Sequence, residues 1–377
     1  MVNVSERARK LHYSSIVIDT HTDSIDRETD THEDLGQRLG DGFSDLPRLK
    51  EGNLTSQFFA CFVDPKYIPR GQSIKRVLDM ADAVKRLCER YPKDIGLAKT
   101  ASDVRGLAKQ GKRSAILAIE GGHAIEDDLA VLRIYHELGV RYMTLTWNNS
   151  NNWADGVLDK SRHNGVTDFG REVVREMERL GMMVDVSHAS EKTFWDVMSA
   201  AKKPVIASHS SAWALCQHPR NMKDEQIKAM KKNGGVVCVC FVSQFLWEPY
   251  RQEFEDLTQK TKLEIWELRN KYKDPQALEG EMKKLQARFD ATSARFESRP
   301  RLQHIADQID YVANLAGIDH VGLGIDLNFY CIPQDIDDCT KLPLLTEELL
   351  RRGYSEQEVR KVLGENVLRL MEETVGR

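Results

Sequence analysis

The sequence lacks any regular pattern of cysteines. The seven cysteines are an odd number at irregular positions, with no Cys-x-x-Cys pair among them. This argues against a disulfide framework and against a zinc site built from thiolates. We expect reduced thiols that have no assigned role.

Long apolar runs are lacking as well. No stretch of about 18 apolar residues occurs, so the sequence predicts no transmembrane helix. Residues 1–10 carry charges that no apolar run follows, and neither a secretory signal nor a transit peptide is visible. We therefore expect a cytoplasmic protein without a membrane partner.

An excess of positive charge is also missing. Lys and Arg total 54 against 58 Asp and Glu, which gives a net charge of -4. This balance offers no overall basic field to hold nucleic acid or an anionic bilayer, so neither partner is expected. The 41% hydrophobic and 30% charged residues are typical of a globular protein, and 377 residues allow one large domain or two.

Three common catalytic signatures are absent, namely Gly-x-Ser-x-Gly, a Walker loop, and Gly-x-Gly-x-x-Gly after a strand. The segment Gly322-Leu323-Gly324 continues with Ile-Asp-Leu instead of a helix-opening glycine. The sequence therefore lacks the signals of a serine hydrolase, a nucleotide hydrolase or a dehydrogenase.

The chain does contain short, β-branched apolar runs that alternate with amphipathic helical segments. This pattern is typical of a parallel sheet covered by helices. Candidate strands lie at residues 16–19, 57–63, 115–119, 141–146, 182–187, 204–208, 235–241 and 320–325, and Gly139 and Gly181 end the helices before two of them. Eight such units favour an α/β fold with a single (β/α)₈ TIM barrel, although an open doubly wound sheet produces a similar pattern.

One segment does not fit the repeat. Residues 248–301 lack a strand signal, are dense in alternating charge, and carry apolar residues at three-four spacing on both sides of Asp274-Pro275. This spacing predicts a helical hairpin inserted between strands seven and eight. Because each helix has only a narrow apolar stripe, we expect it to pack beside the barrel, or to form a homodimer contact, rather than to be an independent domain.

Imidazole and carboxylate side chains recur where the predicted strands end. The first strand ends in His21 and Asp23, and residues two apart point to the same side of an extended chain. The ends of strands three, five, six and eight add Glu120, His188, His209 and Asp326. In a barrel all these ends converge on the face where active sites lie.

Nitrogen and oxygen ligands without thiolate suit zinc or another divalent transition metal at a hydrolytic site. These ligands allow two ions, with His21 and Asp23 holding one, His188 and His209 a second, and Glu120 bridging both. A hydroxide shared by two ions is a strong nucleophile at neutral pH. Asp326 would take its proton and pass it to the leaving group.

Arg220 lies in the loop after strand six, beside the expected site. A guanidinium there can hold a substrate carboxylate through two hydrogen bonds. A solvated loop arginine is the alternative that the residues alone leave open.

Together these residues resemble the membrane dipeptidase (renal dipeptidase) family, peptidase family M19, which belongs to the amidohydrolase-like metal-dependent hydrolases. The resemblance follows one order along most of the chain, at residues 18–23, 45–52, 57–59, 120–123, 141–146, 184–188, 204–211, 220–221 and 349–355. It implies one metal-dependent hydrolase barrel over residues 1–377, with the 248–301 helical insertion within it and two Zn²⁺ per chain.

The resemblance also implies roles for matching positions. His21 and Asp23 match the ligands of one zinc, His188 and His209 those of the other, and Glu120 the catalytic bridge between them. Two further positions match the family's catalytic aspartate and the arginine that holds the substrate carboxylate, and these are Asp326 and Arg220.

Two positions near the expected site depart from the family pattern. Trp147 stands where better-known members carry a substrate-holding His, and we expect Trp147 and Asn148 to contact the substrate. Asp326 is followed by Leu327-Asn328 instead of the family's Phe-Asp-Gly. The insertion at 248–301 is also longer than in most relatives.

The function expected from all these features is hydrolysis of an amide bond next to a free carboxylate by a metal-bridging hydroxide, with a dipeptide as the small-molecule substrate. The replacement at Trp147 leaves open an N-acyl amino acid or lactone as the substrate of the same site. A non-catalytic metal-binding scaffold that uses the hairpin as its contact surface is the alternative outside enzymes.

Overall fold

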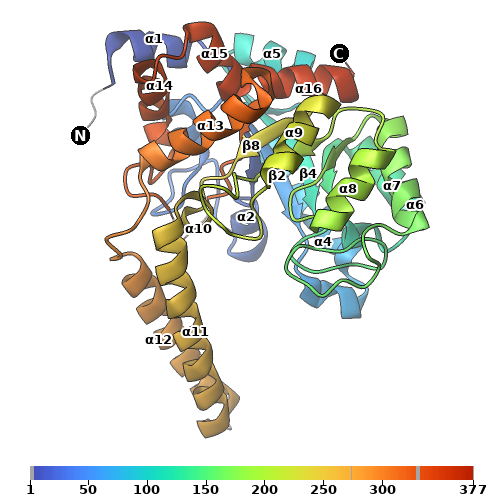
Figure 1. Cartoon of the computed structure of the whole chain (residues 1–377), viewed down its shortest axis with the longest axis vertical. Helices are drawn as coiled ribbons and strands as arrows, with labels where there is room; N and C mark the ends of the chain where they lie inside the picture. Colours follow the sequence, from blue (N-terminus) through green and yellow to red (C-terminus); the bar gives the residue numbers. More distant parts are fainter. Residues whose placement is uncertain (1–3, 273, 328–331, 377) are drawn as a thin grey trace.

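The structure is a computed structural model that describes residues 4–272, 274–327 and 332–376 (Figure 1). Within these residues, eight parallel strands form a nearly closed barrel, and their order around it is β1 (Ile18–Thr22), β2 (Ser56–Phe62), β4 (Arg113–Glu120), β5 (Val140–Thr144), β6 (Met183–Asp185), β7 (Ile206–Ala207), β8 (Val236–Val239) and β9 (Val321–Leu323). A short additional strand, β3 (Ile95–Leu97), pairs with β4. The predicted barrel is confirmed, and the open doubly wound alternative is wrong.

The ends of the strand series, β9 and β1, meet through individual contacts. The backbone N–H of Asp326 donates to the carbonyl of His21 at 3.1 Å. The hydroxyl of Thr20 donates to the carbonyl of Leu323 at 3.0 Å. These bonds bring the last strand against the first, so residues from both ends of the chain share one rim.

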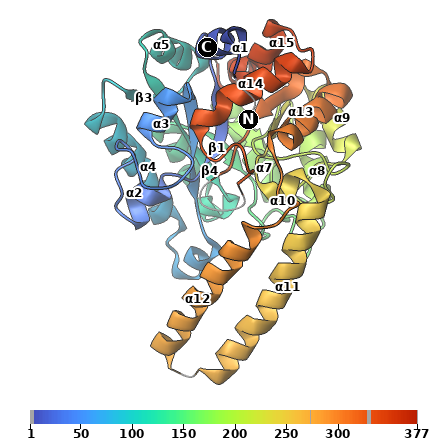
Figure 2. The same cartoon turned by 90° about the vertical axis from the view of Figure 1, so that its left-hand side faces the viewer.

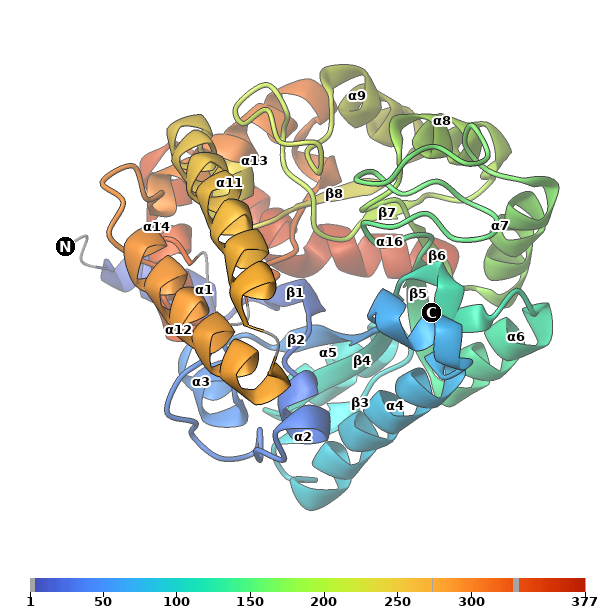
Figure 3. The ribbon, with the colours of Figure 1, turned by 90° about the horizontal axis from the view of Figure 1, so that it is seen from below.

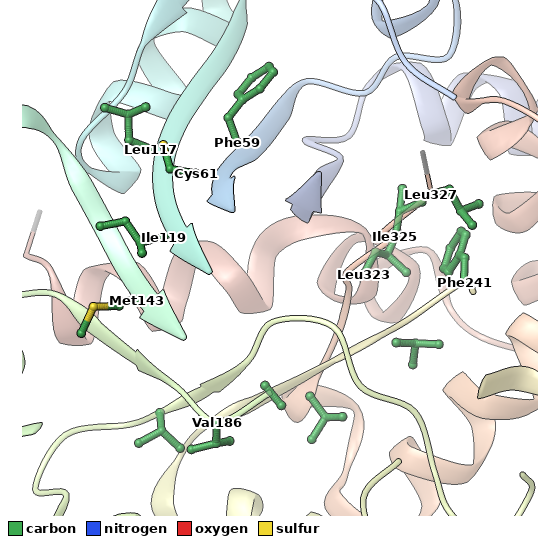
Figure 4. Packing of buried hydrophobic residues seen from close by; sticks show 14 of the residues in the cluster. Phe59, Cys61, Leu117, Ile119, Met143, Val186, Phe241, Leu323, Ile325 and Leu327 are labelled. Carbon is green, nitrogen blue, oxygen red and sulfur yellow. The ribbon is translucent and has the colours of Figure 1, made fainter. Parts of the chain in front are cut away.

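The strands are buried on both faces, which explains why they read as continuous apolar runs. In β4, Ile116 and Ala118 belong to one buried cluster, whereas Leu117 and Ile119 belong to a second and larger one, as the two-residue period of a strand requires. Figure 4 shows part of the larger cluster. Val367 in α16 (Asn366–Thr374) packs into the smaller cluster.

Helices surround the ring of strands (Figure 3). Those between barrel strands include α4 (Ser73–Arg90), α5 (Ala101–Lys109), α6 (Leu129–Leu138), α7 (Asp168–Leu180), α8 (Glu191–Ala200), α9 (Asp224–Asn233) and α13 (Leu302–Ala316). Helices α6 and α7 end at Gly139 and Gly181, both at positive φ, as predicted. Shorter or flanking helices are α1 (Glu6–Tyr13), α2 (Asp26–Asp30), α3 (Leu46–Glu51), α10 (Ser243–Leu246), α14 (Leu342–Arg351) and α15 (Glu356–Arg360). Among the described residues, no helix combines the length and apolar composition needed to cross a membrane.

The segment between β8 and β9 contains two long antiparallel helices, α11 (Glu248–Lys271) and α12 (Pro275–Ser293). They extend away from the barrel (Figures 1 and 2), so the expectation that they pack beside it is wrong. The reason is that their apolar stripes face each other: the rings of Phe254 and Phe289 lie 5.1 Å apart, and Leu285 is buried. A homodimer contact through this hairpin stays a prediction.

Candidate metal centre

The barrel places the predicted ligands at one rim. His21 lies within β1, Glu120 is the last residue of β4, and His188 and His209 follow β6 and β7 closely. His21, Glu120, His188 and His209 are buried. His188 and Asp326 adopt left-handed backbone conformations, with φ of 63° and 54°. Such strained turns are common where a side chain must be aimed into a site.

The carboxylate of Glu120 lies at the centre of the cluster. Its Oε1 is 2.9 Å from Nε2 of His188 and 3.5 Å from Nε2 of His209. Its Oε2 is 3.5 Å from Nε2 of His21, and that nitrogen is also 3.5 Å from Oδ1 of Asp23. The two oxygens of Glu120 therefore face the two ligand pairs that the sequence analysis separates.

The hydrogen-bond partner of Nδ1 determines which ring nitrogen of His21 carries the hydrogen. Nδ1 lies 2.8 Å from the hydroxyl of Tyr142, and that hydroxyl donates its own proton to the carbonyl of Thr20. The tyrosine oxygen can therefore only accept, so Nδ1 of His21 carries the hydrogen and Nε2 offers a lone pair. In the described residues this buried Nε2 makes no hydrogen bond of ordinary geometry.

His209 is oriented in the same way by a serine and an aspartate. The hydroxyl of Ser208 donates to Asp185 at 2.6 Å and lies 2.8 Å from Nδ1 of His209. Because its proton is already used, the serine oxygen accepts from Nδ1–H. Nε2 of His209 therefore also carries a lone pair.

His188 is oriented by the amide oxygen of Asn148, which accepts a hydrogen bond from Nδ1 of His188 at 2.9 Å. The lone pairs of His188 and His209 then face each other with their Nε2 atoms 2.9 Å apart. Two neutral imidazoles repel in this arrangement unless a cation lies between them. The residues present thus fit a divalent metal site of imidazole and carboxylate ligands, with the outer hydrogen bonds that such sites need.

Burial and mutual charge shift the ionisation of the cluster. Burial lowers the pKa of His188 to about 3, and it holds the pKa of His209 well below its usual range. Burial alone would lower the pKa of His21 and raise that of Glu120, but the mutual attraction of the two groups, with Tyr142 adding to it at His21, holds the pKa of His21 well above and that of Glu120 well below its usual range. A metal ion on Nε2 of His21 would take the place of the proton there. Neutral imidazoles and an ionised carboxylate are the forms that bind a metal.

The side chain of Asp326, which follows β9 in the chain, faces the same ligand cluster. Its Oδ1 is 4.0 Å from Nε2 of His21, and together with Asp23 these residues form a second group whose ligand atoms lie within 4.8 Å of one another. Burial raises the pKa of Asp326 to about 8, and the nearby carboxylates of Asp23 and Glu120 add to the shift. A carboxyl group with a raised pKa can hold and release a proton near neutral pH.

A cavity of about 460 Å³ opens beside this cluster. Its walls include Glu120, His188 and Asp326, together with the predicted substrate contacts Trp147 and Asn148. Because the amide of Asn148 holds His188, the structure gives this residue a positioning contact as well as a place in the cavity wall.

Arg220 lies in the same wall and is 95% buried. Its Nη2 donates to the carbonyl of His209 at 3.1 Å, and its guanidinium lies over the ring of Phe245. Among the described residues no carboxylate lies within 4.0 Å of it. A buried cation without an anion is costly, so the site favours an anionic ligand.

The structure brings all nine predicted site residues to this rim or cavity, and it adds groups that the sequence analysis missed. Tyr142, Ser208 and Asp185 orient two of the histidines. Asp185 and Ser208 belong to the strand-end segments that contain His188 and His209, which was the available signal. The loop replacement after Leu327 falls on residues 328–331 and lies outside the described residues.

Comparisons with known proteins agree with this geometry. The family model described as membrane dipeptidase (peptidase family M19) matches residues 5–376. The solved dipeptidase AC, a metallo peptidase of family M19, is 28% identical, with a TM-score of 0.78 over 97% of this chain and 100% of its own. A Rhodobacter sphaeroides metallo peptidase, liganded with a phosphinate mimic of the dipeptide L-Ala-D-Ala, is 27% identical, with a TM-score of 0.77 over 96% and 100%. The probable dipeptidase PvdM from Pseudomonas aeruginosa is 25% identical, with a TM-score of 0.81 over 98% of each chain.

Proposed function

Since this chain belongs to the membrane dipeptidase family, peptidase family M19, we propose that it uses two Zn²⁺ to hydrolyse a dipeptide at the amide bond next to a free carboxylate. Its class as a metallo-dipeptidase hydrolase follows from the family and from its solved relatives. The number of ions, the substrate and the roles of the residues are what the proposal adds.

The observation that carries the proposal is the buried Arg220 beside the ligand cluster. A terminal carboxylate is the anion that a dipeptide supplies, and a guanidinium can hold it with two parallel hydrogen bonds. Arg220 contacts the carbonyl of His209, so a carboxylate held there lies next to the ligands. The neighbouring amide of the substrate would then lie beside the metal centre.

The ligands and the proton carrier have separate tasks in this proposal. His21 and Asp23 would hold one ion and His188 and His209 the other, with Glu120 between them. When bound, the two ions supply the Lewis acidity that activates water and polarises a carbonyl. Asp326 holds the proton and passes it to the departing amine, because its carboxyl group faces the same point as the ligands.

The proposal is tested with zinc-loaded protein on a panel of L,L- and L,D-dipeptides, N-acyl amino acids and lactones, with Asp326→Asn as the comparison. We expect zinc-dependent hydrolysis of dipeptides and a loss of at least about 100-fold in kcat for the variant. No metal-dependent turnover on any member of the panel would overturn it. Higher kcat/KM on N-acyl amino acids or lactones would move the assignment to those substrates, and protein that binds zinc but turns over no member of the panel would favour the metal-binding scaffold.

A further inference from the structure

The cavity extends between opposite sides of the barrel, and different side chains line its two ends. Arg220 is bonded to His209 just after β7, and Phe62 is the last residue of β2. In the order around the barrel, β2 and β7 are four strands apart in either direction. Both residues line the one cavity, so a molecule bound at Arg220 points its other end toward the β1–β2 side.

The β1–β2 side of the cavity carries the carboxyl group of Asp26, the first residue of α2. Its carboxylate accepts from Arg76 Nη2 at 3.0 Å, and its side chain is 29% exposed. Arg76 also makes two hydrogen bonds to Asp30. Burial and the nearby carboxylate of Asp23 raise the pKa of Asp26 to about 8 although Arg76 opposes the shift, so the one guanidinium does not compensate the crowded carboxyl groups and a second cation beside Asp26 is favoured. Of Asp26, Asp30 and Arg76, only Asp26 lines the cavity.

Two aromatic rings line the same cavity as this carboxyl group. Phe62 is paired in register with Glu120, and its ring lies 5.0 Å from the ring of Trp147 at an angle of 55°. Both rings line the cavity. A cavity that holds a carboxyl group and the rings of a Phe and a Trp is an environment that attracts an organic cation.

Resting on the proposed function, we propose that Asp26, Phe62 and Trp147 bind the positively charged side chain of the substrate's N-terminal residue, so that the preferred dipeptides begin with Lys or Arg. With the terminal carboxylate at Arg220, the N-terminal residue lies toward the opposite side of the barrel. A long basic side chain reaches beyond the metal centre to the wall, where its charge meets Asp26 and its methylene groups pack on the rings.

The test compares kcat/KM for two dipeptides, Lys-Ala and norleucyl-alanine, which share the same side-chain length but differ by one positive charge. The wild-type protein is expected to prefer Lys-Ala by about tenfold, and Asp26→Asn to lower that ratio to near one. The matched control is Asp82→Asn, which removes an exposed carboxylate of α4 that pairs with Arg86 and does not line the cavity, and it is expected to keep the ratio. Zinc content is measured for each variant.

Two results would overturn the proposal: a wild-type ratio near one, or an Asp26→Asn variant that keeps the wild-type ratio. An Asp26→Asn variant that loses the same factor in kcat/KM on both dipeptides also keeps the wild-type ratio. That outcome would assign Asp26 to the α-ammonium group that both substrates share. If the wild-type protein cleaves neither dipeptide, the proposed function fails separately. Calorimetric binding of the same two dipeptides then decides this proposal, and equal affinities reject it.

Discussion

Each histidine of the metal centre is held by a different partner through Nδ1: a tyrosine hydroxyl for His21, a serine for His209 and an amide for His188. The candidate ligands were predictable because each stands at the end of an apolar strand. Their partners were not, because Tyr142 reads in the sequence as one more apolar strand residue. Only the pairing of β4, β5 and β6 places it beside a ligand from β1.

Removing the hydroxyl of Tyr142 tests this orientation. Tyr142→Phe keeps the buried ring but leaves Nδ1–H of His21 without an acceptor. We expect zinc affinity to fall by about 10–100-fold while the fold persists, measured by competition with a chromogenic chelator. The matched control is Tyr135→Phe, which removes a buried hydroxyl that donates to the carbonyl of Ala124 instead of contacting a candidate ligand. Unchanged affinity in Tyr142→Phe would contradict the role of the hydroxyl.

Arg220→Met tests the carboxylate site. The wild-type protein is expected to prefer a dipeptide over its C-terminal amide, and the variant is expected to lose about 100-fold in kcat/KM on the free acid and to cleave both alike. Because the change removes a buried charge without an anionic partner, the melting temperature should not fall. A variant that still prefers the free acid would show that another group binds the carboxylate.

The elements divide into those that local sequence determines and those that depend on their surroundings. The barrel strands and the two hairpin helices were predictable from apolar periodicity. The short β3 was not, because its three residues carry too little pattern and it pairs only with β4. The direction of the hairpin was also not predictable, because an apolar stripe does not say whether it faces the barrel or its partner helix.

The seam between α11 and α12 can be weakened selectively. Phe254→Ala removes the ring that packs on Phe289, so the hairpin should open about tenfold more often and become sensitive to limited proteolysis within residues 251–293. The melting of the barrel should change little. Trp266→Ala serves as the control because that ring is 67% exposed. Equal proteolysis of both variants would contradict the packing, and their mass in solution tests the predicted homodimer contact.

Helix α1 is attached to the barrel through a histidine that is neutral when buried. His12 bonds to Thr346 and to the carbonyl of Gly52, and burial lowers its pKa from 6.5 to about 4. The unfolded chain therefore binds more protons between these values, so stability is lost as pH falls from 6.5 toward 4. The loss should approach about 3 kcal/mol. Urea unfolding of wild type and His12→Gln across this range measures it, and parallel pH curves would contradict it.

At the scale of the whole molecule, the site exists only when the barrel is complete. Its candidate ligands come from β1 and β4 and from the segments after β6 and β7, and Asp326 follows β9, so no part of the chain holds the centre alone. The length of the sequence left one or two domains open. The position of the ligands on strands spread from residue 18 to residue 323 argues for one barrel. Cytoplasmic location stays a prediction that fractionation of cells would test.

Removal of the metal should therefore lower the stability of the entire barrel. Dialysis against a strong chelator leaves buried imidazoles and carboxylates facing one another without a cation. The folded state also loses the stabilisation that it gains from binding metal ions that the unfolded chain does not hold. We expect the apparent melting temperature to fall by about 5–10 °C and to recover when zinc is restored. Calorimetry at matched scan rates measures the difference. A melting temperature that does not change while the metal is demonstrably absent would contradict a metal centre that spans the strands.

The hairpin of α11 and α12 offers a site for labels that lies far from the candidate ligands. Helix α11 has 24 residues, so its far end lies about 36 Å from its base. Within the described residues both helices meet the rest of the protein at that base, and none of the candidate ligands lies on them. An epitope tag or a fluorescent dye placed at the tip would therefore report on rotation and assembly of the protein without disturbing its chemistry, and would give small particles an asymmetric marker for electron microscopy.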